Sequence, residues 1–408
     1  MIGQWIAEIE GEASATLRVE LEDRGAGYIG RAYLFYPDAN FPGFLFDVRL
    51  PAQPPFRATL STIYLYTNGG IMSGEDRRKA EESLKANSGS TPPSEFEVEF
   101  SHDGAQLRVD WSYMPGQETV SPEAKGLLNR LRRTPHHPVQ PVNGTVNLTL
   151  SDPAGPSALV ARPELSAWDQ FRQWAVAQPV RRYVFRGQRE PRKLVSSFHR
   201  TWRNNVSRWI DDDTSRLFGA VAEQLNYPLQ PGNLLHNSAI WSILQHHGYP
   251  TPMLDWSYSP FVAAYFAYEQ AEREGSAPRI FIFDQTSWND RYGKASLIVD
   301  PAPNQLVVIE SMGVANPRHA PQQAISTVTN VADVEAFIRK REQEDGQTYL
   351  TACDLPVDSR PQIMRELELM GITYGSLFPG LDGICRDMRD RLFALPTPAS
   401  AGEMNSEA

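Results

Sequence analysis

The chain has 408 residues, a formal net charge of −10 and an isoelectric point near 5.4. An acidic chain is poorly suited to tracking the nucleic-acid backbone or an anionic membrane, which argues against both classes of function. Its length predicts two domains, and its two cysteines, Cys353 and Cys385, are too few for a disulfide framework and lack metal-ligand spacing. Because there is neither a signal-peptide pattern nor a window apolar enough to cross a bilayer, we expect a cytoplasmic protein without a membrane partner.

Residues 1–150 are predicted to form an all-β domain. Apolar and polar residues alternate over 15–21, 96–100, 107–111 and 146–150, and turn-forming Gly, Pro and Asp residues separate these segments. Several short alternating strands are typical of an antiparallel β-sandwich or barrel. No catalytic spacing is present in this domain, so we expect it to serve recognition or packing.

A linker rich in Pro, Gly and Ser is predicted at residues 151–165, followed by a mixed α+β domain over 166–395. Its expected helices cover 166–177, 360–370 and 381–393. Its expected strands cover 181–188, 279–283, 295–299, 305–309, 322–328 and 349–353. The tail at 396–408 is expected to be disordered.

The second domain is organised around residues 242–268. Ile240, Ile243, Leu244 and His247 recur at the spacing of one helical face, and Gly248 is placed to end that helix in the left-handed conformation. A short strand at 253–257 comes next. Ser259 and Pro260 then suit the N-cap and first turn of a buried helix. Helix ends with unpaired N–H groups favour anionic ligands, so this stretch predicts a site for one.

Three residues allow two interpretations each. His247 is either a core histidine or a catalytic group, and Ser259 is either only a cap or part of the site. Arg186, on an otherwise apolar strand just before Gly187, either contacts a phosphate together with the glycine backbone or forms a structural pair with Asp255. Asp255, between Leu254 and Trp256, is expected to need hydrogen bonds or a cation.

Several motifs in the second half resemble the FRG domain family, which is named for its Phe-Arg-Gly motif. They are Tyr183 to Gln188, Gln245 to Ser257, Ser259 to Ala267, Asn316 to Gln323 and Leu377 to Gly383, so the resemblance covers about residues 165–395 and leaves out the N-terminal domain. The order of these motifs is also similar to that of ADP-ribosyltransferases of the Arg-Ser-Glu type. That similarity implies NAD as a substrate and no metal.

The resemblance implies a role for individual residues. Arg186 would hold a phosphate of NAD, Ser257 would support the nicotinamide ribose, and Asp255 and Trp256 would shape the pocket. Gly187, Gln188, His246 and Tyr265 are expected to contribute to the same nucleotide site, and His246 and His247 could act as acid–base groups. Gln323 occupies the position of the catalytic glutamate, which leaves Asp255 or Glu310 as an alternative acid.

Two functions follow from these expectations. The first is an NAD-consuming enzyme, either an ADP-ribosyltransferase with a protein or nucleic-acid acceptor or an NAD glycohydrolase, acting as a toxin or anti-phage effector. The second is a non-catalytic module that holds a nucleotide or a protein, with the β domain as a recognition surface. Gln323 favours the second function, because glutamine supplies no charge to stabilise an oxocarbenium-like centre.

Overall fold

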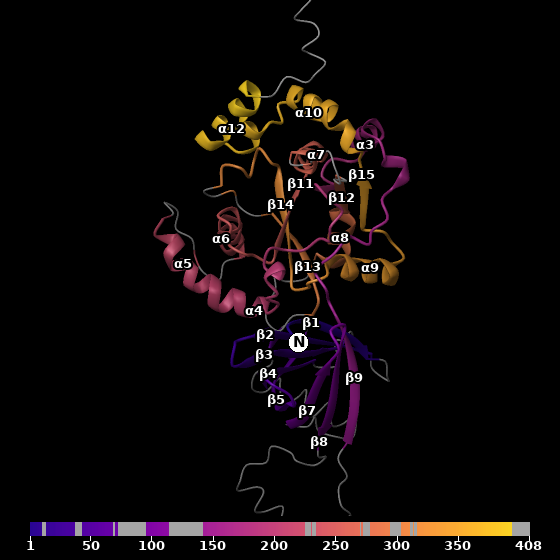
Figure 1. Ribbon diagram of the computed structural model, residues 1–408, viewed down its shortest axis with the longest axis vertical. Coiled ribbons are helices and arrows are strands. Elements are labelled where there is room, and N and C mark those ends of the chain that lie inside the picture. The colour runs from indigo at the N-terminus through magenta and orange to yellow at the C-terminus, as the bar shows by residue number, and fades with distance from the viewer. Residues whose placement is uncertain are drawn as a thin grey trace, which may run out of the picture.

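The chain folds into an N-terminal barrel-like sheet at one end of the long axis and a larger α+β region at the other (Figure 1). The computed structural model describes residues 1–9, 14–36, 43–67, 70–71, 95–113, 142–224, 230, 234–269, 271, 278–293, 303–310, 313 and 316–393. The strand predicted at 295–299 and the tail at 396–408 lie outside these residues.

Strands β1 to β9 make up the barrel-like sheet, and they are β1 (Gly3–Ile9), β2 (Ala15–Asp23), β3 (Gly27–Phe35), β4 (Gly43–Pro51), β5 (Phe56–Thr67), β6 (Gly70–Ile71), β7 (Glu95–His102), β8 (Gln106–Tyr113) and β9 (Val142–Leu150). The strand order is β4-β3-β2-β1-β9-β8-β7-β5-β6, and an additional β4–β5 pairing brings the sheet nearly to closure. Alternate side chains from eight of these strands fill the interior, among them Trp5, Val19, Val48 and Leu148. The all-β expectation is confirmed, with the barrel rather than the sandwich as its form.

Strand β2 is buried on both faces, which its alternating sequence does not predict. Leu21 points into the barrel, whereas Arg18, Glu20 and Glu22 on the opposite face are also almost fully buried. The second region of the chain covers that outer face: the Arg18 Nη1 donates to Asn304 Oδ1 at 2.7 Å. A guanidinium can be buried here because it also pairs with Glu20, with 3.1 Å between Nε and the carboxylate.

A second antiparallel sheet organises the α+β region. Its strands are β10 (Tyr183–Gln188), β11 (Met253–Ser257), β12 (Arg279–Asp284), β13 (Leu306–Ile309), β14 (Ala324–Thr329) and β15 (Leu350–Asp354), in the order β13-β14-β11-β10-β12-β15. The strands predicted at 279–283, 305–309 and 349–353 are confirmed within one residue at each end. The strand predicted at 322–328 begins two residues later, because Gln323 adopts a left-handed backbone conformation with φ of 47°.

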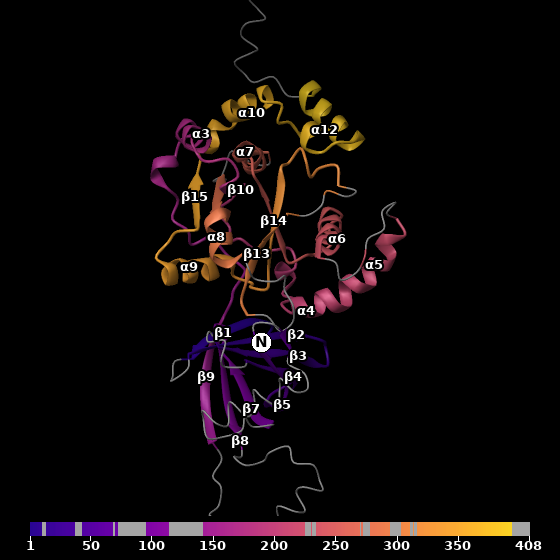
Figure 2. The same ribbon diagram turned by 180° about the vertical axis from the view of Figure 1, so that it is seen from behind.

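Helices cover both faces of this sheet. α3 (Trp168–Val176), α7 (Pro260–Tyr268) and α10 (Arg360–Leu369) share one core, and α8 (Gln285–Tyr292) and α9 (Val334–Asp345) share the other. α5 (Ser215–Ala222) and α6 (Leu234–His246) lie to one side of the sheet (Figure 2). Before α5 in the chain come the short segments η2 (His199–Thr201), α4 (Val206–Arg208) and η3 (Trp209–Thr214). α12 (Leu381–Leu392) lies at the end remote from the barrel, and α11 (Tyr374–Leu377) contacts it. The expected α+β class is confirmed.

The segment between the two regions is in contact with the second one. This segment, residues 151–162, precedes the short η1 helix (Pro163–Leu165). Another short helix, η4 (Val357–Ser359), lies later in the chain, directly before α10. Lys193 Nζ donates to the carbonyl oxygen of Asp152 at 2.9 Å, and Ser157 Oγ donates to Glu335 at 2.8 Å. The domain limits predicted at 150, 165 and 395 stay predictions.

Candidate functional site

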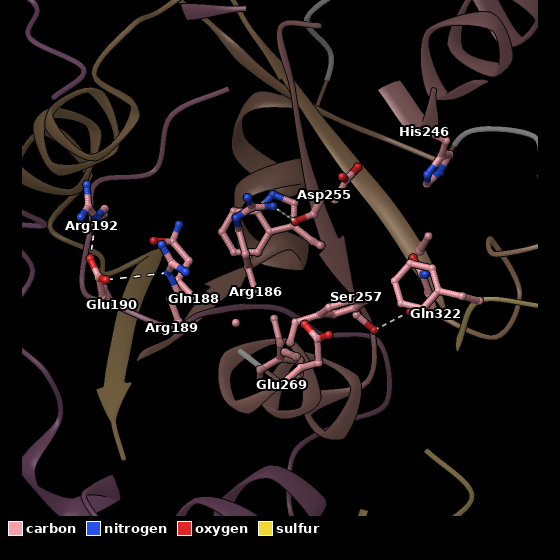
Figure 3. A pocket seen from close by; sticks show the side chains of 17 residues that line it. Arg186, Gln188, Arg189, Glu190, Arg192, His246, Asp255, Ser257, Glu269 and Gln322 are labelled. Carbon is pink, nitrogen blue, oxygen red and sulfur yellow. Dashed lines mark hydrogen bonds and ion pairs between the residues drawn. The ribbon is translucent and has the colours of Figure 1, made fainter. Parts of the chain in front are cut away.

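A pocket opens in the second sheet where β10 and β11 diverge. These neighbours share one residue pair, Phe185 with Ser257, whereas β10 pairs with β12 along all six of its residues. The two strands therefore separate after Phe185, and a pocket of about 620 Å³ opens between them. This volume is in the range of small-molecule sites. Figure 3 shows its polar side chains, which include Arg186, Gln188, Arg189, Glu190, Arg192, His246, Asp255, Ser257, Glu269 and Gln322.

Arg186 projects across this opening. Its Nη1 donates to the backbone carbonyl oxygen of Asp255 at 2.7 Å (Figure 3). Because β10 and β11 do not pair at this point, this carbonyl would otherwise lack a strand–strand hydrogen bond. Within the described residues, this is the only hydrogen bond of the guanidinium, no carboxylate lies within ion-pair distance, and its Nε is buried without a partner. Burial lowers the pKa of Arg186 and the nearby Asp255 opposes that shift, but a guanidinium stays charged. The expected pair with Asp255 exists through its backbone instead of its carboxylate.

Gly187 is required for packing. A Cβ at this position would lie 1.8 Å from the carbonyl oxygen of Ala263 and 2.7 Å from the amide nitrogen of Ala267. Both atoms belong to the backbone of α7, so glycine lets this helix lie directly on β10. Packing against α7 is therefore a sufficient reason for glycine here. The expected contact between the Gly187 backbone and a phosphate stays a prediction, and both Gly187 and Gln188 line the pocket.

Asp255 brings a carboxylate into the pocket. It is the one exposed residue of β11, and the described residues give its carboxylate no hydrogen bond. Asp255 was expected to need hydrogen bonds or a cation, but Leu254 and Trp256 point into the core on the other face of the strand, so its carboxylate is exposed instead. His246, at the end of α6, lines the same pocket. Burial lowers the pKa of His246, and Asp255 opposes the shift, so the imidazole is mostly neutral near pH 7.

Ser257 and Trp256 hold the pocket in shape. Ser257 is buried, its Oγ donates to the carbonyl oxygen of Gln322 at 2.7 Å, and it accepts from the Ser259 amide at 3.0 Å. Trp256 donates from Nε1 to Thr327 at 3.0 Å within the core. Both residues line the pocket, but their polar groups already have partners. Ser259 is the N-cap of α7 and accepts from the Val262 amide, as predicted.

An aromatic wall closes one side of the pocket. Phe378 lines it together with Phe266, and the two rings meet edge to face with centroids 6.1 Å apart. Phe378 also stacks on Tyr374, with 4.4 Å between the ring centroids, and the Arg318 guanidinium lies 5.0 Å from the centre of the Phe378 ring. Gln322 Nε2 donates to the carbonyl oxygen of Leu377 at 2.9 Å and so fixes this wall to the segment before β14.

Four predicted residues lie outside the pocket lining. His247 follows the last residue of α6 and is exposed, so it does not share the apolar face of that helix. Gln323 is exposed, and its neighbour Gln322 lines the pocket instead. Tyr265 is buried within the α7 core. Glu310 accepts from the Tyr258 hydroxyl at 2.6 Å on the surface.

Four charged residues of the pocket were not predicted. Arg189, Glu190 and Arg192 form a rim after β10, with 2.7 Å between Arg192 Nε and the Glu190 carboxylate. Their position directly after the Phe-Arg-Gly motif is a signal that could have identified them. Glu269, at the end of α7, forms an ion pair with Arg386 from α12. Because 117 residues separate these partners, local sequence offers no signal for the pair.

Where the structure describes the chain, no three His, Cys, Asp or Glu side chains are grouped as metal ligands. Among the helices of the described residues, none has both the length and the apolar character needed to cross a bilayer.

Comparison with known proteins gives one match. Residues 181–276 match the model of the FRG domain. No curated protein and no solved structure matches the chain. The matched segment contains β10, α6, β11 and α7, and these elements carry most of the pocket. The chain therefore contains an FRG domain.

Proposed function

We propose that the pocket binds a nucleotide of the NAD type by its diphosphate and cleaves the bond between nicotinamide and ribose. The single observation that carries this proposal is Arg186, a half-buried guanidinium on the pocket floor whose only hydrogen bond within the described residues goes to a neutral carbonyl. A cation partly withdrawn from water and not in an ion pair is unfavourable, and the planar guanidinium is suited to phosphate oxygens. A bound diphosphate would supply the missing negative charge.

Other features of the pocket support a nucleotide over a simple anion. On the rim, Arg189 and Arg192 share the single carboxylate of Glu190, so these three residues carry one net positive charge near the entrance. The rings of Phe266 and Phe378 offer an apolar face against which a planar base could pack. Anion-binding and ring-binding surfaces thus occur together in one pocket of suitable volume.

Asp255 is the proposed catalytic carboxylate. As nicotinamide leaves with the bonding electron pair, positive charge develops at the ribose, and a nearby carboxylate stabilises it. Water then adds to the ribose carbon, giving ADP-ribose, nicotinamide and one proton. The neutral imidazole of His246 could accept that proton. A protein or nucleic-acid nucleophile in place of water would give ADP-ribosyl transfer, as expected of a toxin or anti-phage effector.

A second candidate is a module that holds the nucleotide without cleaving it. Two observations favour it: Glu269, the other carboxylate beside α7, is already paired with Arg386, and the side chain near the start of β14 that lines the pocket is the uncharged Gln322. In this case the barrel would act as the recognition surface for a partner.

The test combines two assays of the full chain. The first monitors the release of nicotinamide from NAD by chromatography, and the second measures the binding of ADP-ribose by thermal shift. Arg186→Ala should abolish both signals, and Asp255→Asn should keep binding but slow release about 100- to 1000-fold. Arg108→Ala, on the exposed barrel surface, is the matched control. Binding without release, with cell lysate supplied as acceptor, would select the second candidate. Wild-type release by a folded Arg186→Ala protein would refute both.

A further inference from the structure

Helix α12 exposes its apolar face and packs its polar face against its own chain, the reverse of the usual arrangement of a surface helix. Its apolar side chains form a stripe that faces outward: Leu381 is 80% exposed, Ile384 55%, Met388 44% and Leu392 69%. Their spacing of three, four and four residues places them on one face of the helix. In the ribbon diagram α12 lies at the end of the molecule remote from the barrel (Figure 1). We call these four residues the α12 stripe.

The side of α12 that packs on its own chain is polar. Gly383 is buried against the carbonyl oxygen of Phe378, where a Cβ would come within 1.8 Å. The Arg386 guanidinium lies 4.1 Å from the ring centre of Tyr374 and pairs with Glu269. Arg391 pairs with Glu368 of α10 at 3.4 Å. A surface helix normally buries its apolar face, so the outward orientation of the stripe indicates that another apolar surface covers it.

We infer that this surface is α12 of a second copy of the chain, in an antiparallel pair. Asp382 and Arg389 are seven residues apart and therefore project from the same flank of the stripe. In an antiparallel two-fold pair, equal flanks of the two helices meet. With the crossing between Arg386 and Asp387, Leu381 meets the partner copy's Leu392, and Asp382 comes within about 3 Å along the axis of the partner copy's Arg389.

The charged residues of α12 favour an antiparallel pair of two copies over a parallel pair or a membrane surface. In a parallel pair, Asp382 would face the opposite flank, and Arg391 there is nine residues, or about 14 Å, further along the axis. Only the antiparallel arrangement therefore joins opposite charges at both ends. A membrane surface would favour a helix with a net positive charge, whereas α12 contains three aspartates and three arginines.

The test is sedimentation equilibrium of the full chain from about 1 to 100 µM. A single helix pair is a small interface, so the wild type should dimerise with a micromolar Kd. Ile384→Glu combined with Met388→Glu should raise that Kd at least about 10-fold. Val160→Glu is the control, because Val160 is 88% exposed but far from α12 in sequence. A monomeric wild type, or a dimer unaffected by the α12 substitutions, would overturn the inference.

Two further variants test the antiparallel register. Asp382→Arg and Arg389→Asp should each weaken the dimer, and the double exchange should restore it. Cys385 is exposed on the same face while Cys353 is buried, so a short bismaleimide should join two copies through Cys385. Cys385→Ser should prevent this product. Failure of the double exchange to restore association would exclude the proposed register. All variants are compared by circular dichroism, so that misfolding is distinguished from loss of pairing.

Discussion

Arg186 donates a hydrogen bond to the backbone carbonyl oxygen of Asp255 across the opening between β10 and β11, at 2.7 Å. One side chain thus replaces a missing strand–strand hydrogen bond and places its charge on the pocket floor. The conformation of the guanidinium is fixed before any ligand enters, which reduces the entropy lost on binding. Structure and recognition therefore depend on the same residue.

Replacing Arg186 with lysine should separate these two roles. Lysine keeps the charge, but it cannot hold the carbonyl and a phosphate in one planar fork. We expect the affinity for ADP-ribose to fall about 10- to 100-fold, or about 1.4 to 3 kcal/mol. Isothermal titration calorimetry measures this change, with Arg108→Lys on the barrel as control. Equal affinities for Arg186→Lys and the wild type would remove the guanidinium from the proposed contact.

Gly187→Ala should destabilise the protein strongly. The new methyl group would lie 1.8 Å from the Ala263 carbonyl oxygen, so α7 would have to move away from β10. We expect a loss of about 3 kcal/mol in the free energy of unfolding, measured with urea. The control is Gly219→Ala on α5, where nothing lies within 4 Å of the added Cβ, and it should stabilise by about 0.5 to 1 kcal/mol. Equal stabilities of the two variants would contradict the packing role.

Gln4 should contribute to stability by joining the barrel to the FRG-containing region. Its Nε2 donates to the carbonyl oxygen of Asn330 at 2.7 Å, and its Oε1 accepts from the Ala332 amide at 3.1 Å. Gln4→Ala removes both of these buried hydrogen bonds, at a cost of about 3 kcal/mol. Chemical denaturation checks this value, and the exposed Gln106→Ala should change stability by less than about 0.5 kcal/mol. A negligible effect of Gln4→Ala would mean that water replaces the side chain.

His199 should make the protein less stable in acid. It is fully buried, its Nδ1 lies 2.7 Å from Ser196 Oγ, and burial together with Arg18 lowers its pKa from 6.5 to about 3. Between these values the unfolded chain binds a proton that the folded chain does not, so stability falls as the pH drops from about 6.5 towards 3. The slope from this group approaches about 1.4 kcal/mol per pH unit.

The variant His199→Gln removes that titration. Urea unfolding at pH 7.5 and pH 5 should show a loss for the wild type that exceeds the loss for His199→Gln by about 2 kcal/mol. His247→Gln, which removes an exposed imidazole, controls for the substitution itself. The same pH dependence in wild type and His199→Gln would show that His199 is protonated in the folded state.

The local elements and the Phe-Arg-Gly strand could be predicted from sequence because they depend on short-range patterns. Strand alternation located β2, β7 and β8, an apolar run located β12, and Ser259 with Pro260 located the start of α7. The burial of Arg18, Glu20 and Glu22 could not be predicted, because their partners are supplied by a region about 180 or more residues away. The expectation that Asp255 needs hydrogen bonds or a cation did not allow for strand alternation, which places Leu254 and Trp256 on the opposite face. His247 was expected on the apolar face of the helix, but α6 ends one residue before it.

The position of Gln323 shows the limit within the site. The resemblance to ADP-ribosyltransferases implies the catalytic position for Gln323. In the structure its backbone is left-handed and its side chain is exposed, and Gln322 lines the pocket. A shift of one residue reverses the face of a strand, so motif order alone cannot assign the contact.

The pairing of β10 also bears on how this FRG domain could be isolated. The matched segment ends at residue 276, three residues before β12, yet β12 supplies all six partners of β10. Likewise, β14 supplies the five partners of β11. Residues 181–276 alone would hold two strands joined by a single residue pair, each with an open outer edge. The matched segment is therefore shorter than the six-stranded sheet to which it belongs, and we expect an excised fragment to aggregate unless it extends at least through β15.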